Sequence, residues 1–471
     1  IPPNDAMQWH PCFEKFTCAN LLVPLDYANV SAGYTNIAFL KQDASIQPAK
    51  DILINPGGPG GSGINYVRNH HIKLRQNLGP NYNLVGFDPR SVNNSGPHLD
   101  YYRCMGKPLN KIEKLDQAWC KNALANGEAK YTGTVAVAQD MLNYIELRNE
   151  ELGKHGEDAK LNFFGASYGT ALGATFAATY PDRVERMILD AVMDTAAYYK
   201  AKQNNDAGDA AEVLRHFSPL CFAAGPERCS FHGGNKTAAD IEARIQTIFT
   251  RLTNKSIVCT SPDLPNLPPH KLDGIDLAYV MFMAAYHPIT SFPALAETFV
   301  ELEKGEGRKF LEQLWDGSRI LKDQAGDVGQ GVMIHCLDPA LARLGKKLEG
   351  RRNPFPLVAI QYLLAGQNQQ CEYRDFVPPP SQQFLVGFVE TKTSFPIMFV
   401  GTAADPVTPI RGAYAMSKYF PGSVVLKQDS IGHCFGSSSS ECTRKHVQAY
   451  LAGSVPIEGT VCQPDLLPFE E

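Results

Sequence analysis

Residues 163–169, with the sequence FFGASYG, constrain the fold of this 471-residue chain more than any other segment. They form a G-x-S-x-G motif that follows an apolar strand pattern and precedes a small-residue helical pattern at 170–179. A serine between a buried strand and a helix occupies a sharp, strained turn, and Gly165 and Gly169 leave room for it. The turn holds the Ser167 hydroxyl above the carboxyl end of a sheet, beside a helix N-terminus that favours negative charge. The sequence therefore predicts a nucleophilic serine.

A glycine-rich segment, 55–63 (NPGGPGGSG), directly follows another apolar run at 52–54. Its five glycines leave backbone N–H groups unobstructed, so the loop can donate hydrogen bonds to a developing oxyanion. A phosphate-binding loop would end in Lys-Ser/Thr, which this segment lacks. The second donor is expected to be the backbone N–H of the residue after the nucleophile. We therefore expect Gly58 and Tyr168 to form an oxyanion hole.

The strand signals gather at the two ends of the chain. Eight short apolar runs bounded by Gly, Pro, Asn or Asp are predicted to be strands: 21–25, 36–40, 52–54, 84–87, 161–164, 187–189, 397–400 and 424–426. The first two runs are close enough in sequence for an antiparallel hairpin. Helix-length stretches separate the later runs, as parallel βαβ units require.

Between the strands at 187–189 and 397–400, helical patterns such as 239–252 and 295–302 replace the strand signal. We interpret this stretch as a helical cap inserted between two strands of one sheet, where it would exclude water and shape a substrate pocket. The predicted division is a core part at 1–194, a mainly helical cap at 195–390 and a second core part at 391–471.

A nucleophilic serine needs a base, and on this kind of strand–turn–helix the acid and the histidine follow the serine in that order. Two of the twelve histidines lie beyond the last strand pair. His433 comes shortly after the strand at 424–426, at the carboxyl edge of the sheet. His446 lies in an amphipathic helical pattern and is expected at the surface. We therefore expect His433 to be the base.

The orienting carboxylate has two candidates. Asp405 follows the strand at 397–400, in the loop after the penultimate strand. Asp429 lies only four residues before His433, on what we expect to be the same loop. We favour a triad of Ser167, Asp405 and His433.

Two other patterns are interpreted as structural. His70 and His71 have no carboxylate or cysteine at metal-ligand spacing, so we expect solvated loop residues. Asp88 and Arg90 follow another strand, and we expect an ion pair that ties loops together under the site.

Composition places the chain among globular proteins and narrows its compartment. Its 44 basic and 49 acidic residues give a net charge of −5, which offers no basic surface for nucleic acid. No apolar run is long enough for a transmembrane helix. Twelve cysteines without a CxxC motif or a zinc spacing favour disulfides, hence a secreted or vacuolar enzyme; the alternative is twelve reduced thiols in a cytosolic enzyme. The predicted triad implies no metal or organic cofactor. Four N-glycosylation sequons agree with a glycoprotein: Asn29, Asn93, Asn235 and Asn254.

Taken together, these residues resemble the α/β-hydrolase superfamily, and more narrowly the secreted tripeptidyl aminopeptidase-like serine hydrolases, relatives of proline iminopeptidases. The resemblance implies an α/β-hydrolase fold, with an eight-stranded, mostly parallel sheet and a large helical cap insertion. It is specific at both ends of the chain and weak in the cap. The matching segments are 9–27, 55–63, 86–90, 165–194, 401–409, 432–433 and 453–462.

The resemblance also implies disulfide pairings. It pairs Cys442 with Cys462, Cys336 with Cys371, Cys104 with Cys120, and Cys12 with Cys18. Among the other four cysteines the connectivity stays open, and a bridge between Cys221 and Cys229 is our expectation.

The sequence is compatible with three functions. The first is a secreted serine exopeptidase that removes short peptides or single residues from free N-termini through an acyl-enzyme. The second uses the same triad on a non-peptide ester, lactone or amide, because a fold does not fix the substrate. The third is a non-catalytic binding protein, which would be expected to lack a triad member. An acidic cap pocket would favour the first and a mainly apolar one the second.

Overall fold

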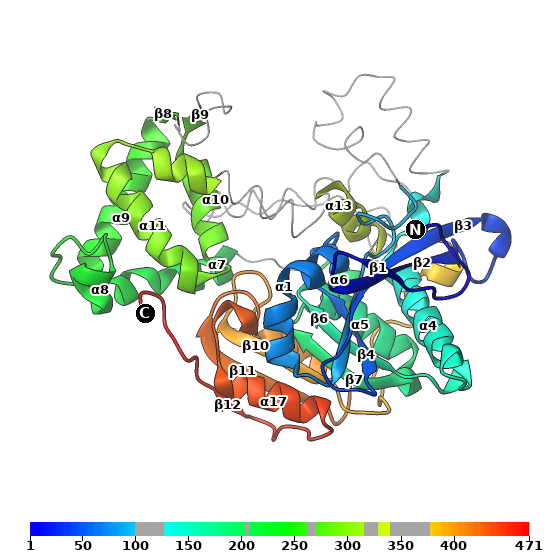
Figure 1. The fold of residues 1–471 in the computed structure, drawn as a ribbon. Helices are drawn as coiled ribbons and strands as arrows, with labels where there is room; N and C mark the ends of the chain where they lie inside the picture. The colour runs from blue at the N-terminus through cyan, green and yellow to red at the C-terminus, as the bar shows by residue number, and fades with distance from the viewer. Residues whose placement is uncertain (99–126, 203–206, 261–269, 315–327, 340–376, 471) are drawn as a thin grey trace, which may run out of the picture.

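The computed structural model describes residues 1–98, 127–202, 207–260, 270–314, 328–339 and 377–470 (Figure 1). Its main sheet has ten strands in the order β1-β2-β3-β5-β4-β6-β7-β10-β11-β12. Their bounds are β1 His10–Cys12, β2 Phe16–Pro24, β3 Tyr34–Gln42, β4 Lys50–Asn55, β5 Tyr82–Phe87, β6 Leu161–Ala166, β7 Val184–Asp190, β10 Met398–Ala404, β11 Val424–Ile431 and β12 Val461–Cys462.

The sheet is mostly parallel, as predicted. The seven strands from β5 to β12 in the sheet order pair in parallel, while β1, β2 and β3 pair antiparallel at one edge. All eight predicted strands are present, and β2 and β3 form the expected antiparallel pair. The predicted number of eight is wrong, because β1 and β12 extend the sheet at its two edges. With three and two residues, these strands are too short to show an apolar pattern.

Two layers of helices cover the sheet. Helices α1 (Gly63–Leu78) and α17 (Glu441–Leu451) pack on one face, and α4 (Thr134–Glu151), α5 (Tyr168–Thr179) and α16 (Arg411–Ser417) pack on the other. Side chains of β4 show why its apolar run is continuous. Ile52 and Ile54 join the core beneath α1, whereas Leu53 joins the core beneath α4 and α5, because successive residues of a strand face opposite ways.

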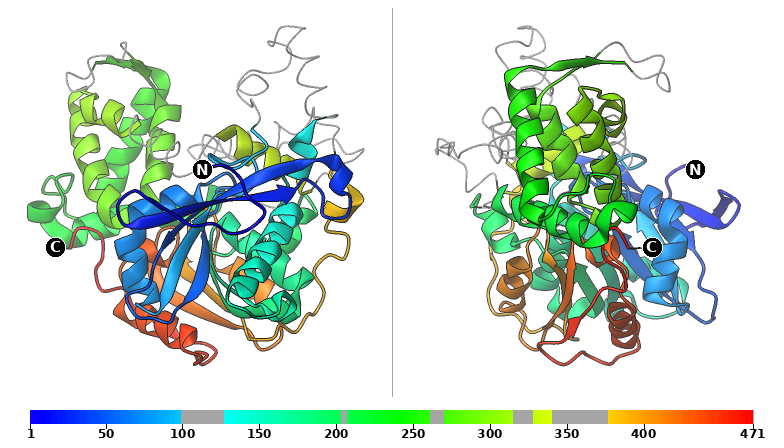
Figure 2. Two further views of the ribbon diagram at one scale, coloured as in Figure 1. Left: turned by 45° about the vertical axis from the view of Figure 1, so that its right-hand side comes forward. Right: turned by 90° about the vertical axis from the view of Figure 1, so that its left-hand side faces the viewer.

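Between β7 and β10 the chain builds a separate helical layer, seen in green beside the sheet in Figure 1 and above it in both views of Figure 2. The predicted helical patterns at 239–252 and 295–302 lie in α9 (Ala238–Asn254) and α11 (Pro288–Lys304). Helices α7 (Ala207–Arg215), α8 (Phe217–Arg228) and α10 (Gly274–Ala284) join them around a second apolar core. Capping boxes start α9 at Thr237 and α10 at Asp273. The boundaries at 194/195 and 390/391 stay predictions.

Three predicted disulfides are present, Cys12–Cys18, Cys221–Cys229 and Cys442–Cys462. Cys336 is also disulfide-bonded, but its predicted partner, Cys371, lies outside the described residues, as does the predicted pair of Cys104 and Cys120. Cys259 and Cys434 are free thiols.

Removal of the Cys442–Cys462 bridge is expected to lower the free energy of unfolding by about 3 kcal/mol, because the bridge closes a loop with a sequence separation of 20 residues. The bridge ties α17 to β12 at the sheet edge. Urea unfolding of the Cys442→Ala/Cys462→Ala variant would measure the change. The matched Cys12→Ala/Cys18→Ala variant opens a separation of only six residues and should lose less. Equal midpoints for the first variant and the wild type would contradict the expectation.

The asparagines of the four predicted glycosylation sites differ in exposure. Asn29, Asn93 and Asn254 are exposed and Asn235 is half-buried, so modification at these sites stays a prediction. None of the helices in the described ranges is long and apolar enough to cross a membrane.

Candidate active site

Ser167 occupies the turn between β6 and α5 with a positive φ, at φ 56° and ψ −126°. Such a conformation is strained for a residue with a side chain and persists only where the surroundings enforce it. A Cβ atom at Gly165 would lie 2.4 Å from the carbonyl oxygen of Gly169, and one at Gly169 would lie 2.5 Å from that of Asn55. The sharp turn predicted from the motif is therefore present, and both glycines are sterically required.

His433 and Asp405 form a buried pair at the same edge of the sheet, because β10 and β11 are parallel and end there. The His433 Nδ1 atom lies 2.9 Å and 3.0 Å from the two carboxylate oxygens of Asp405. The same carboxylate accepts hydrogen bonds from the backbone N–H groups of Val407 and Thr408, at 2.9 Å and 2.8 Å. These bonds fix the carboxylate and orient the imidazole, so that Nε2 is the nitrogen left for a substrate reaction.

Asp429, the competing acid, lies elsewhere. It is exposed, and its carboxylate lies 3.1 Å from the Lys427 ammonium group. The geometry therefore favours Asp405 as the partner of His433.

The charge state of His433 depends on two opposing influences. Burial lowers its pKa, but the Asp405 carboxylate and, less strongly, the Asp190 carboxylate raise it by more, so that the net pKa lies above 6.5. The imidazolium form cannot accept a proton from a serine hydroxyl.

We therefore expect kcat/KM to fall as the pH drops through an apparent pKa above 6.5, the ordinary value of histidine. The sign follows from the raised pKa, because protonation of His433 then begins at a higher pH. A pH–rate profile with a substrate that does not titrate in this range would measure it. An acid limb centred below 6.5 would contradict the expected influence of Asp405.

Ser167 and His433 both line one cavity of about 400 Å³. Its wall combines the glycine-rich loop, α1 and the loop after β11 with segments of the insertion. Tyr286 and His287 come from the connection between α10 and α11, and His335 comes from α13 (Val328–Leu337). The backbone N–H of His433 donates to the Tyr286 carbonyl oxygen at 2.9 Å, which joins the histidine loop to the insertion. The cavity therefore lies between the sheet and the insertion.

The glycine-rich loop lies against the serine turn. Gly57, Gly58 and Gly60 have φ values of 94°, 111° and 98°. A Cβ atom at Gly57 would lie 2.7 Å from the backbone nitrogen of Tyr168. The Gly57 N–H donates to the Asn55 side chain at 2.9 Å, whereas in the part of the chain that the structure describes no acceptor takes the Gly58 N–H. Gly58 lines the cavity, as an oxyanion donor must, whereas Tyr168 is not among the described residues that line it, so the pairing of Gly58 and Tyr168 as donors stays a prediction.

Asp190, which was not predicted from the sequence, ends β7 beside His433 and lines the cavity. Its carboxylate accepts the Phe435 backbone N–H at 3.1 Å, and its burial raises its pKa to about 7. Its place directly after the apolar run 187–189 was the available signal. A carboxylate at the end of a parallel strand reaches the same edge as Ser167 and Asp405.

The expected ion pair between Asp88 and Arg90 is wrong. Arg90 instead pairs with Asp140 of α4, with Nε 2.7 Å from a carboxylate oxygen. Asp88 is buried and accepts a hydrogen bond from the Ser62 hydroxyl at 2.5 Å. Arg90 and Asp140 are 50 residues apart, so local sequence could not reveal the pairing.

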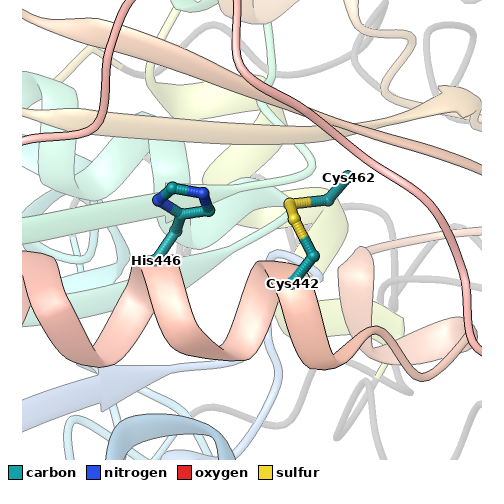
Figure 3. A group of neighbouring side chains, drawn as sticks. All are labelled: Cys442, His446 and Cys462. Atoms are coloured by element: carbon teal, nitrogen blue, oxygen red, sulfur yellow. A yellow bond between two sulfur atoms is a disulfide. The ribbon is translucent and has the colours of Figure 1, made fainter.

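His70 and His71 differ from expectation as well, whereas His446 lies in the expected helix. His70 and His71 lie in α1 rather than in a loop, and His70 lines the cavity. His446 is half-buried in α17, and its ring lies beside Cys442 and Cys462 (Figure 3). These three side chains have the spacing of metal ligands, but the two sulfur atoms are joined in a disulfide and are not thiolates.

Comparisons with known proteins agree with this architecture. A family model described as alpha/beta hydrolase fold matches residues 51–218, and one described as TAP-like protein matches residues 358–462. Serine protease Hip1 of Mycobacterium tuberculosis is 25% identical over 502 aligned residues, which cover 98% of this chain and 91% of that protein. Tripeptidyl aminopeptidase of Streptomyces coelicolor is 25% identical over 498, covering 98% and 87%. Putative hydrolase YuaR of Escherichia coli is 27% identical over 471, covering 95% and 88%.

Proposed function

We propose that this chain, which belongs to the α/β-hydrolase superfamily, is a serine exopeptidase that releases short peptides or single residues from free N-termini. The observation that carries the proposal is one cavity lined by both Ser167 and His433, with His433 held by Asp405. Similarity to a serine protease and to a tripeptidyl aminopeptidase over nearly the whole chain supports peptides as the substrate class.

In the proposed reaction, the Ser167 oxygen attacks the scissile carbonyl carbon while His433 Nε2 takes the hydroxyl proton. Asp405 accepts a hydrogen bond from the His433 Nδ1–H group and stabilises the imidazolium that forms. The N–H groups of Gly58 and Tyr168 hold the oxyanion. The C–N bond then breaks, His433 gives its proton to the leaving amine, and an acyl-enzyme remains. Water, deprotonated by His433, attacks the acyl carbon. The bond to the Ser167 oxygen then breaks, His433 returns the proton to that oxygen, and the N-terminal product leaves.

The compartment is part of the proposal. The Cys12–Cys18, Cys221–Cys229 and Cys442–Cys462 bridges favour an oxidising environment, hence secretion or a vacuolar location. No metal or organic cofactor enters the proposed steps.

One observation keeps an ester, lactone or non-peptide amide as the second candidate. Of the described residues that line the cavity, Asp190 is the only carboxylate, and it already accepts the Phe435 N–H. An N-terminal ammonium group would be expected to meet a carboxylate. An ester would need none.

A fluorophosphonate probe followed by peptide mapping tests whether the site is reactive. We expect one adduct, on Ser167, which is absent from the Ser167→Ala variant. An unlabelled hexapeptide and a short acyl ester are then incubated separately with the protein, and mass spectrometry identifies the products. N-terminal fragments of one to three residues support the proposal, whereas hydrolysis confined to esters supports the alternative. A protein that forms no adduct and cleaves nothing would support the non-catalytic hypothesis.

A further inference from the structure

The cavity beside Ser167 carries four basic side chains that the proposed reaction does not use, His335 of α13 and three from α1 and the segment before α11. His70 and Lys73 come from α1, where a spacing of three residues places them on the same helix face. His287, the residue before α11, comes from the insertion and lines the same cavity. Two elements far apart in sequence thus bring basic groups to one wall.

This wall lacks balancing negative charge. The Lys73 ammonium group donates to the Gly436 carbonyl oxygen at 2.6 Å, and among the described residues no carboxylate forms an ion pair with it. Asp190, the carboxylate in the described lining, instead accepts the backbone N–H of Phe435. A cavity with an unpaired cation attracts an anionic group of a ligand.

The basic groups also lie close enough to influence one another. Burial, followed by His433, Lys73 and His70, lowers the pKa of His287 to about 4. Burial and the Lys73 ammonium group lower the pKa of His70. Both imidazoles are therefore mainly neutral near pH 7, and each still has one N–H to donate.

We infer that Lys73, His70 and His287 form a subsite that binds a carboxylate of the substrate. An ammonium group with two imidazole N–H donors suits a carboxylate, because charge-assisted hydrogen bonds are stronger than those between neutral groups. Lys73 and His287 keep exposed surface and His70 is half-buried, so the subsite is accessible to solvent. The inference rests on the proposed function and deepens it by naming a substrate feature. The carboxylate is either the C-terminus of a short peptide or an acidic side chain.

Two pairs of peptides separate these sources. One pair differs only in a C-terminal free acid or amide, and the other only in Glu or Gln within a peptide amide. We expect wild-type kcat/KM to favour the acidic member of one pair by about 10-fold, the effect of one charge-assisted hydrogen bond. The preferred pair identifies the source. The preference should shrink with added salt, because salt screens the Lys73 charge.

Variants at Lys73 test whether this residue provides the preference. Lys73→Gln should bring the acidic-to-neutral ratio close to 1, and the matched Lys73→Arg variant, which keeps the charge, should retain most of it. The ratio is the readout because Lys73 also holds Gly436 in the histidine loop, so its loss can lower both rates together. His287→Asn should reduce the ratio in part.

Equal rates within both pairs for the wild type, or an unchanged ratio in Lys73→Gln, would overturn the inference while peptide cleavage itself would leave the proposed function standing. If no peptide is cleaved, the same comparison is made with an ester that carries a carboxylate and its neutral amide analogue. A preference for the carboxylate ester that Lys73→Gln removes would then keep the subsite and reject the exopeptidase.

Discussion

The Ser167→Ala variant should lose kcat by a factor on the order of 10⁶ and still fold, because Ser167 forms the acyl-enzyme in the proposed reaction. Cys434, a free thiol that also lines the cavity, is a poor substitute, because burial and the Asp190 and Asp405 carboxylates raise its pKa and keep it protonated. Alanine has the same backbone restrictions at φ 56°, so the strain of the turn does not change. The Gly165 and Gly169 contacts that hold the turn also remain.

Steady-state kinetics on one peptide substrate, with thermal unfolding of the same samples, measures both parts of this expectation. Ser45→Ala, a change at an exposed serine in the loop after β3, is the matched control and should leave the rate unchanged. Retention of more than a small fraction of wild-type kcat in Ser167→Ala would show that another residue is the nucleophile.

The Asp405→Asn variant should lose about 10⁴ in kcat, through the wrong imidazole tautomer. An amide at this position can present its NH₂ group to His433 Nδ1, which then accepts, and the proton moves to Nε2 where a base is needed. The asparagine oxygen can still accept from Val407 and Thr408, so the loop should keep its shape.

Asp429→Asn is the matched control for this change. Asp429 is exposed and contacts Lys427, so the kcat of the Asp429→Asn variant should stay close to that of the wild type. A near-normal rate in Asp405→Asn together with a dead Asp429→Asn variant would reverse the assignment of the acid.

Much of the fold was accessible from the sequence because its strands are buried on both faces. Runs such as 52–54 and 187–189 are apolar at every position, since one side chain faces the core under α1 and α17 and the next faces the core under α4 and α5. Strands β1 and β12 were missed, because a strand of two or three residues at a sheet edge needs no apolar pattern. The mostly parallel sheet was confirmed, while its size was underestimated.

The candidate site, too, was predictable from the sequence only in part. Ser167, Asp405 and His433 each follow a strand pattern, and parallel strands bring their carboxyl ends to one edge, so their proximity was predictable. The grouping of His70, Lys73 and His287 was not predictable, because it depends on which face of α1 lies toward the segment before α11. Proximity between distant elements leaves no local pattern in a single sequence, as with His287 and α1, which line one cavity, or Arg90 and Asp140, which form an ion pair.

One comparison of substrates tests whether this chain is a serine exopeptidase. A chromogenic tripeptide amide is offered with a free and with an acetylated N-terminus, beside a short acyl ester, to the wild type and to Ser167→Ala. The proposal predicts that the wild type releases the chromophore from the free-amine peptide, leaves the acetylated peptide intact, and that Ser167→Ala releases it from neither. Turnover of the ester with neither peptide cleaved would contradict the proposal and make the enzyme an esterase.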